Sequence, residues 1–470
     1  MTFSFETSRR SFGLLFAALS LSLAGCDIDE TLAVQDPDVA NPSSLNDITV
    51  LPTLRASTIS DLQVSFGASG EDGVVNYGAL LGDEFTWSET FPTRGEMDQR
   101  NINPFNGTLS ALYNNLQRAR ATADRTAAAY YLLAPTQIGR SETQAIAAFT
   151  YILLGETFCN GVPVSNFDVN AGTFVLGTPQ TTAQLFATAL AKLDSALVGV
   201  DVAVTGNAQV VNLIRVGRGR ALLNLNRPAD AAAAVAAVPT SYRYILFHSE
   251  NTARQNNNIF NVSLNFPRFS VSGNEGGTGL RYRLDGATDA RVFAPRGRGV
   301  ALSPSVGADG TTPQFVVTKY PSRSAPIIFA DGVEARLIEA ENAVRSGAAY
   351  IDILNTLRAS AATLILTPPG PTTLLTDAPP VAALPPLAEP AAQAARIDQV
   401  FQERAYWMFL TGHRLGDMRR LIKHIGRDSE TVFPTGTYFK GGAYGVDVNF
   451  PVPFQETNNP NFTQCLDRNA

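Results

Sequence analysis

The sequence predicts a mainly α-helical protein built from paired helices, with irregular loops and a few short strands. Apolar residues recur every three or four positions in several long segments, which is the spacing of one helix face. Prolines and glycines interrupt these segments after short intervals, as they do between the helices of a hairpin. The stretch from 240 to 328 lacks this period and is rich in asparagine, glycine and scattered aromatic residues, which favours loops and strands.

Residues 1–25 have the pattern of a signal peptide. The basic pair Arg9 and Arg10 precedes an apolar run over 12–23, and that run is too short to cross a bilayer of roughly 30 Å as a helix. The sequence Leu23-Ala24-Gly25-Cys26 matches a lipobox, which predicts cleavage before Cys26 and lipid on its thiol. The alternative is an ordinary secretory signal in which Cys26 stands by chance.

The export route stays open, because residues 8–12 also resemble a twin-arginine signal. Residues 26–52 are polar, hold three prolines and show no sustained period, which is typical of a lipidated tether. We expect a single folded domain over 53–470, with its ordered body beginning near Leu54. The mature chain is long enough to bury a large core.

Three helices are expected in the first half of this domain. Residues 110–131 are rich in helix formers and carry a stripe of leucine and alanine. Ser141 and Gln144 have the spacing of a capping box, which predicts a second helix from there to about Phe158. A third helix begins at Thr182, where apolar residues recur every four positions.

A helical hairpin is predicted over 213–238. A helix over 213–225 is followed by Asn226-Arg227-Pro228, which places proline at the first position of the next helix, where its missing N–H costs nothing. The small residues around Ala221 and Ala231 resemble a tetratricopeptide unit. Because no 34-residue period is sustained, we expect degenerate repeats rather than a regular solenoid.

Helices return in the last third of the chain. A second hairpin is expected over 331–345 and 350–359, with Gly347 between its helices. Residues 364–390 contain eight prolines and predict an exposed insert. A long helix follows over 391–409, and residues 431–453 are typical of turns and short strands.

Charge and motifs exclude several classes of function. The formal charge of −6 and the absence of a basic run argue against nucleic acid as a partner. No nucleophile elbow, zinc-protease motif or phosphate loop is present, and there are three histidines. We therefore expect no catalytic residues, cofactors or metal ions. A glycoside hydrolase stays a weaker alternative, since its two carboxylates need only meet in space.

Cys159 and Cys465 are the cysteines that remain beside Cys26. In an exported protein they are predicted to form a disulfide. The alternative is a pair of buried free thiols.

The segment 403–420 resembles a signature of the SusD/RagB nutrient-binding lipoproteins. Glu403-Arg404, Thr411-Gly412-His413-Arg414 and Asp417-Met418-Arg419-Arg420 follow its order, although Thr411 stands where the family usually has an acid. Weaker similarities lie in 144–164, 334–341, 355–358 and 450–460. We interpret the charges of the signature as structural, with charge-assisted hydrogen bonds that fix helix packing. The alternative is that they form a ligand clamp.

The resemblance implies a function as well as a fold. It implies tetratricopeptide-like hairpins as scaffold, loops that bind a glycan or another nutrient, and a SusC-like TonB-dependent transporter as partner. It also implies an anchor in the outer membrane at the cell surface, with no bond broken. A peptide-binding protein of this fold, and a structural lid for the transporter without its own ligand, are the alternatives.

Residues 76–100 are the predicted ligand site. Sugar sites pair a flat aromatic ring with carboxylate, amide or guanidinium groups, and this segment offers that mixture. The expected ligand residues are Tyr77, Asp83, Glu84, Trp87 and Arg94. Trp87 either stacks on the ligand or packs under a loop, and a second, weaker candidate combines 256–258 and Phe260 with Arg281 and Tyr282.

Overall fold

The computed structural model describes residues 47–67, 70, 72–168, 171, 173–283, 289–297, 305–366 and 381–470. The predicted signal peptide, Cys26, most of the tether and the centre of the proline-rich insert lie outside the described residues. Residues 48–470 form one compact unit.

Helices dominate the described chain, as predicted. The helices of the first half are α3 (Leu51–Gly67), α4 (Val74–Leu81), α5 (Pro92–Asp98), α6 (Gly107–Leu133), α7 (Ile138–Thr157), α8 (Thr182–Leu197), α9 (Ala208–Asn224) and α10 (Pro228–Val235). Those of the second half are α11 (Asn258–Phe260), α12 (Gly332–Ser346), α13 (Ile351–Ala359), α14 (Ala361–Leu364), α15 (Gln393–Trp407), α16 (Arg414–Lys423) and α17 (Ser429–Val432).

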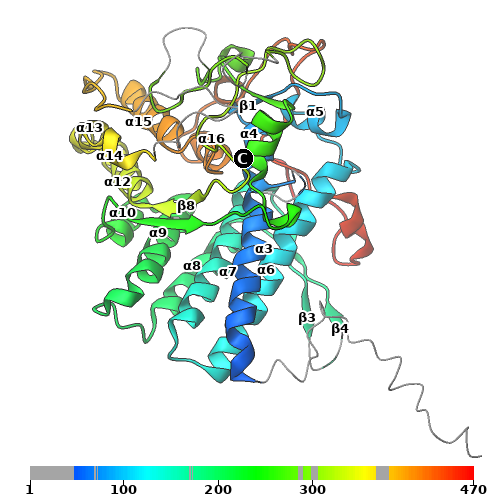
Figure 1. The fold of residues 1–470 in the computed structure, drawn as a ribbon, viewed down its shortest axis with the longest axis vertical. Coiled ribbons are helices and arrows are strands. Elements are labelled where there is room, and N and C mark those ends of the chain that lie inside the picture. Colours follow the sequence, from blue (N-terminus) through cyan, green and yellow to red (C-terminus); the bar gives the residue numbers. More distant parts are fainter. Residues whose placement is uncertain are drawn as a thin grey trace, which may run out of the picture. The chain divides into compact units, whose positions relative to one another are not determined.

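The long helices pack side by side in chain order. Figure 1 shows α3, α6 and α7 running alongside one another, with α8, α9 and α10 following. Helix α7 is buried over almost its whole length, whereas α6 buries one apolar stripe. In α6 the stripe is the one expected from the sequence, and Leu112, Leu116 and Ala119 are fully buried. The first α-helix begins at Leu51, which is itself buried, three residues before the expected start of the body near Leu54.

The predicted hairpin around Pro228 is confirmed. Helix α10 begins at Pro228 and packs against α9, and both Ala221 and Ala231 are fully buried in the contact. Gly219 lies where a Cβ would clash with Val235 of the second helix. Small residues therefore allow the close approach that a tetratricopeptide-like pair requires.

The second hairpin, α12 with α13, is also confirmed. Asp331 caps α12 by accepting a hydrogen bond from the Glu334 N–H at 2.7 Å. Gly347 ends the helix with a φ of 74°, a left-handed conformation that favours glycine. The hairpin packs against α15 around a separate core that includes Leu337, Leu354 and Trp407.

Two local predictions are wrong. Helix α7 begins at Ile138 rather than at Ser141, whose hydroxyl instead accepts a hydrogen bond from Arg140, so the expected capping box does not form. A box does form at the next helix, between Thr181 and Gln184. In the region 431–453 the predicted turns are present, with glycines in turn conformations, but the described residues form a helical turn and isolated bridges instead of the predicted short strands.

Strands pair in twos and link distant parts of the chain. The pairs are β1 (Phe85–Trp87) with β7 (Phe269–Val271), β2 (Val162–Pro163) with β5 (Pro179–Gln180), β3 (Asn166–Asp168) with β4 (Thr173–Val175), and β6 (Arg243–Leu246) with β8 (Ile327–Asp331). All four pairs are antiparallel. The first pair brings the predicted ligand segment beside the irregular region.

The C-terminal segment is fastened to the end of α7. Cys159 and Cys465 form a disulfide across 306 residues of sequence. The Cys159 N–H donates to the Phe450 carbonyl at 2.8 Å, and the Leu466 N–H donates to the Asn160 carbonyl at 2.8 Å.

The end of the proline-rich segment lies against α13. The Leu384 N–H donates to the Arg358 carbonyl at 2.9 Å, and Leu387 exchanges hydrogen bonds with the Asn355 side chain. Residues 381–390 are therefore an extended strap over a helix, without helical structure of their own.

Candidate functional site

The predicted acidic pair lies in the core. Asp83 is fully buried and accepts two hydrogen bonds from the Arg414 guanidinium, at 2.6 and 2.7 Å. Glu84 is buried beside it and accepts a hydrogen bond from the Leu410 N–H at 2.7 Å. Burial raises the pKa of Glu84 to about 8. These carboxylates serve the fold, and neither is placed to meet a ligand from solvent.

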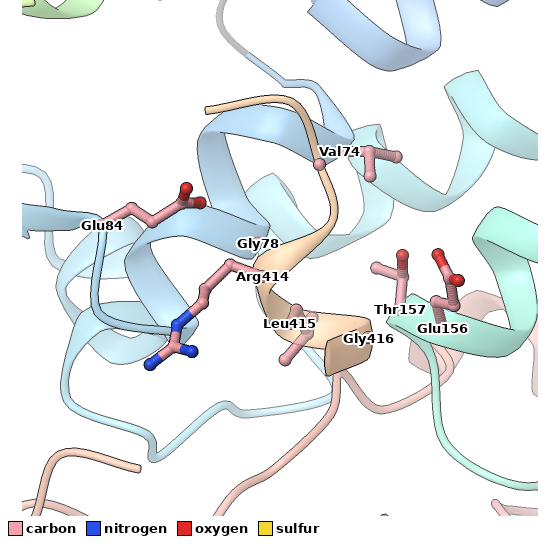
Figure 2. Close-up of a pocket in the computed structure, with 9 residues that line it drawn as sticks. Val74, Gly78, Glu84, Glu156, Thr157, Arg414, Leu415 and Gly416 are labelled. Carbon is pink, nitrogen blue, oxygen red and sulfur yellow. The ribbon is translucent and has the colours of Figure 1, made fainter. Parts of the chain in front are cut away.

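Asp83 and Glu84 stabilise the turn between α15 and α16 through their hydrogen bonds with Arg414 and Leu410. Leu410 has a φ of 50° and Gly412 a φ of 69°, so this turn contains a left-handed non-glycine residue that its surroundings must stabilise. Figure 2 shows Arg414 extending from the start of α16 toward the Glu84 segment, with Glu156 at the end of α7 on the other side. The void between them is about 10 Å³, room for one water molecule.

Tyr77 is also a core residue. Its side chain is fully buried in α4, and its hydroxyl donates to Asp72. Three of the five expected ligand residues are therefore buried in the core. Sequence reasoning missed this because composition alone does not show whether a segment is exposed, and Tyr77 lies in a helix that the sequence did not predict.

The family-like signature forms a buried ionic network. Glu403 pairs with both Arg291 and Arg358, and Arg404 donates to Asp417 at 3.0 Å. Arg420 joins Asp417 to Glu341 of α12. Burial by itself would raise the pKa of Asp417, but Arg404 and Arg420 hold it below its usual range. This arrangement fits the structural interpretation, and a ligand clamp would need groups that solvent can reach.

The second, weaker candidate is mostly buried too. Asn257 caps α11 with its side-chain oxygen and donates to the Ala325 carbonyl at 2.9 Å. Asn258, Phe260 and Tyr282 are buried, while Arg281 is exposed. This segment is a packed corner of the irregular region.

Trp87 and Arg94 reach the surface, where they meet residues from three other segments. We call this set the Trp87 surface: Trp87, Glu89, Phe91, Arg94, Phe266, Arg268, Asp309, Phe439 and Lys440. Phe91, Phe266 and Phe439 are 54%, 44% and 43% exposed. Three large aromatic rings gathered around half-buried cations give faces on which a sugar ring can stack.

Cations pack against the aromatic rings of the Trp87 surface. The Lys440 ammonium lies 3.7 Å from the centre of the Trp87 ring. The Arg94 guanidinium lies 5.1 Å from the Phe91 ring, and that of Arg268 lies 4.9 Å from the Phe266 ring. Such contacts keep guanidinium and ammonium groups in fixed positions at an exposed site.

Two carboxylates hold these cations in place through ion pairs. Glu89 is buried and lies 2.8 Å from Arg94 and 3.6 Å from Arg268. Asp309 lies 2.6 Å from the Lys440 ammonium. Burial opposes ionisation of Asp309, but hydrogen bonds from Lys440 and Thr312 outweigh it and set its pKa at about 2. The arrangement presents hydrogen-bond donors beside apolar ring faces.

Sequence reasoning found the first segment of this surface and missed the others. Phe266, Arg268, Phe439 and Lys440 lie in stretches without a motif. The available signal was weak: in 266–268 and in 439–440 an aromatic residue stands within two positions of a cationic residue. Position in the sequence does not show that 85–94, 266–268 and 439–440 lie together in the fold.

Within the described residues, no cluster of His, Cys, Asp or Glu is arranged to hold a metal ion. In the same part of the chain, no helix has the length and apolar composition needed to span a membrane.

Comparison with known proteins identifies the fold. No protein-family model matches the chain, and no curated protein matches its sequence. Among solved structures, a SusD superfamily protein from Parabacteroides distasonis aligns with a TM-score of 0.63 at 13% identity, covering 88% of this chain and 98% of its own. The chain has the SusD-like fold.

Other solved proteins of the SusD-like fold are described as glycan-binding. A laminarin-binding SusD-like protein aligns with a TM-score of 0.59 at 14% identity, covering 89% of this chain and 99% of its own. Surface glycan-binding protein A from Bacteroides uniformis aligns with a TM-score of 0.61 at 12% identity, with the same coverage. These two neighbours are described as binding proteins rather than enzymes. At such identities the likeness establishes the fold, as the sequence signature implied.

Proposed function

We propose that this protein binds a glycan on the Trp87 surface and delivers it to a SusC-like TonB-dependent transporter, while lipid on Cys26 anchors it at the cell surface. The observation that carries the proposal is the group of exposed rings, Phe91, Phe266 and Phe439, interleaved with Arg94, Arg268 and Lys440. The glycan-binding descriptions of two neighbours of the same fold support it.

We infer different roles for the residues of the Trp87 surface. Lys440 covers one face of Trp87, so a sugar meets the exposed phenylalanine rings first. Arg94, Arg268 and Lys440 then donate hydrogen bonds to sugar hydroxyls. A stacked sugar reaches the Trp87 ring once the Lys440 ammonium moves from it toward a ligand oxygen.

Calorimetric titration of the mature chain with a panel of oligosaccharides tests the binding step. We expect Phe91→Ala to weaken binding about tenfold or more, because a stacking ring at a binding hot spot is worth on the order of 2 kcal/mol. Phe174→Ala is the matched control, since Phe174 is 71% exposed on β4, outside the Trp87 surface. Equal affinities in both variants would move the site elsewhere.

Three further outcomes separate the alternatives. Binding to oligopeptides with none to sugars would indicate a peptide-binding protein. No soluble ligand, together with co-purification of a transporter from detergent-solubilised outer membrane, would indicate a structural lid. Release of reducing sugar from a bound glycan would indicate an enzyme.

The anchoring step has its own test. In intact cells, Cys26→Ser should release the body from the membrane fraction, and external protease should cleave the lipidated protein. A protected body would place it on the periplasmic side.

A further inference from the structure

A cavity of about 100 Å³ opens among β8, the start of α12 and the end of α15, and it is lined by residues outside the Trp87 surface. A single water needs roughly 10–15 Å³ by this measure, so the space fits a ligand of on the order of ten non-hydrogen atoms. Its walls are mainly apolar and include Val292, Ile328, Val333, Met408 and Phe409. Apolar walls with a few polar groups are typical of small-molecule sites.

Most polar groups at the cavity are already used by the protein. Arg291 is held by Asp289 and Glu403, which take both sides of its guanidinium. The Thr318 hydroxyl donates to the Phe293 carbonyl at 2.6 Å, and the Thr411 hydroxyl donates to the Met408 carbonyl at 2.5 Å. These groups have internal partners and do not set the chemistry of a ligand.

Lys319 and Asp331 retain hydrogen-bonding capacity at the cavity. Both side chains are half-buried and line it. The Lys319 ammonium donates to the Phe409 carbonyl at 2.7 Å, and an ammonium has three N–H donors. One carboxylate oxygen of Asp331 accepts a hydrogen bond from the Glu334 N–H. No group of the described chain donates a hydrogen bond to the other oxygen.

The two groups carry opposite charges near neutral pH. Burial lowers the pKa of Lys319 to about 8 and raises the pKa of Asp331 to about 6. They influence each other electrostatically, yet no ion pair joins them within the described residues. An anionic and a cationic group of one ligand can therefore each meet a partner of opposite charge.

We propose that this cavity binds a free apolar α-amino acid of about the size of leucine, with its carboxylate on Lys319, its ammonium on Asp331 and its side chain among the apolar walls. The charges select a zwitterion, because a monocarboxylate would leave Asp331 facing the apolar chain and an amine would leave Lys319 unpaired. The site is separate from the Trp87 surface and does not rest on the proposed glycan function.

Isothermal titration of the full mature chain tests this with three matched probes: L-leucine, 4-methylpentanoate, which lacks the amine, and 3-methylbutylamine, which lacks the carboxylate. We expect L-leucine to bind at least about tenfold more tightly than either analogue, since each loses one charged hydrogen-bonding pair. No binding of L-leucine at millimolar concentration, or equal binding of 4-methylpentanoate, overturns the proposal.

Two variants assign the roles without removing structural contacts. Asp331→Asn keeps a side-chain acceptor for the α12 cap, and Lys319→Gln keeps an N–H donor for the Phe409 carbonyl. Each should weaken L-leucine binding about tenfold or more. Asp331→Asn should leave binding of 4-methylpentanoate unchanged or stronger, an effect that structural damage would not produce.

The exposed Arg227→Gln variant is the control and should bind L-leucine as the unaltered chain does. Circular dichroism checks that each variant is folded. L-leucine affinity that is the same in both cavity variants and the control would overturn the assignment.

Discussion

The α15–α16 turn and the Trp87 surface both gather arginines, carboxylates and aromatic rings, but they differ in exposure. At the turn, Arg404, Arg414 and Asp417 are buried and paired. At the Trp87 surface, Phe91 and Phe439 stand about half exposed. The region with the clearest sequence signature thus holds the fold together, and the proposed ligand surface is assembled from segments without one.

The largest effect should come from breaking the buried network. Asp417→Asn removes the charge that faces Arg404 and Arg420 at 3.0 and 2.8 Å. We expect unfolding free energy to fall by about 3 to 5 kcal/mol, because uncompensated buried charges remain. Urea denaturation followed by circular dichroism measures it.

Asp230→Asn is the matched control for this variant. Its partner Arg227 and Asp230 itself are 52% and 55% exposed in their side chains, so the loss should stay below about 1 kcal/mol. Equal losses in the two variants would mean that burial does not distinguish the network.

Removal of the disulfide should have the next largest effect. Cys159→Ser with Cys465→Ser frees a loop of 306 residues, and loss of a native disulfide typically costs about 2 to 4 kcal/mol. The same urea titration measures the change, with thiol counting before and after reduction as its check. Two free thiols in the unreduced, unaltered protein would contradict the bond.

Glu84 should make stability depend on pH. Its pKa is raised to about 8 in the fold, above the unfolded value, so the folded chain holds a proton that the unfolded chain loses near pH 4.5. The resulting stability is present at low pH and lost as pH rises toward 8, at up to about 1.4 kcal/mol per unit.

Glu84→Gln should flatten that slope while keeping an acceptor for the Leu410 N–H. Urea midpoints at pH 5, 7 and 8.5 compare the two chains. An unchanged slope would assign the dependence to another group.

The smallest stability effect is expected at the Trp87 surface. Lys440→Gln loses the cation over the Trp87 ring and the ion pair with Asp309, together about 1 kcal/mol. Glycan affinity should fall by more than this stability change suggests, because the ammonium is proposed to bind the ligand. A loss above 3 kcal/mol in urea titration would place Lys440 with the structural group instead.

The helices could be predicted because their evidence is local. Pro228 and Gly347 determine where a helix begins or ends through their own backbone preferences, and both positions were predicted correctly. The Ser141 capping box failed because four residues with the right spacing also occur inside a helix. A local sequence pattern does not show whether a capping-box spacing lies at the start of a helix or within it.

The site could be predicted only in part, because exposure depends on distant partners. Asp83 and Trp87 lie four residues apart in the same segment, yet Arg414 buries one and Lys440 packs on the other. Neither partner is within 300 residues of that segment in sequence. The resemblance to a known fold predicted the helical scaffold but not these contacts between distant residues.

The bond between Cys159 and Cys465 has a consequence for the order of synthesis. Cys159 follows α7, and Cys465 lies 306 residues further along the sequence. The disulfide at the end of this central helix can therefore close only after synthesis has passed residue 465. A polypeptide that stalls or is cut before residue 465 lacks this bond, so the end of α7 is then joined to the segment around Phe450 by hydrogen bonding alone.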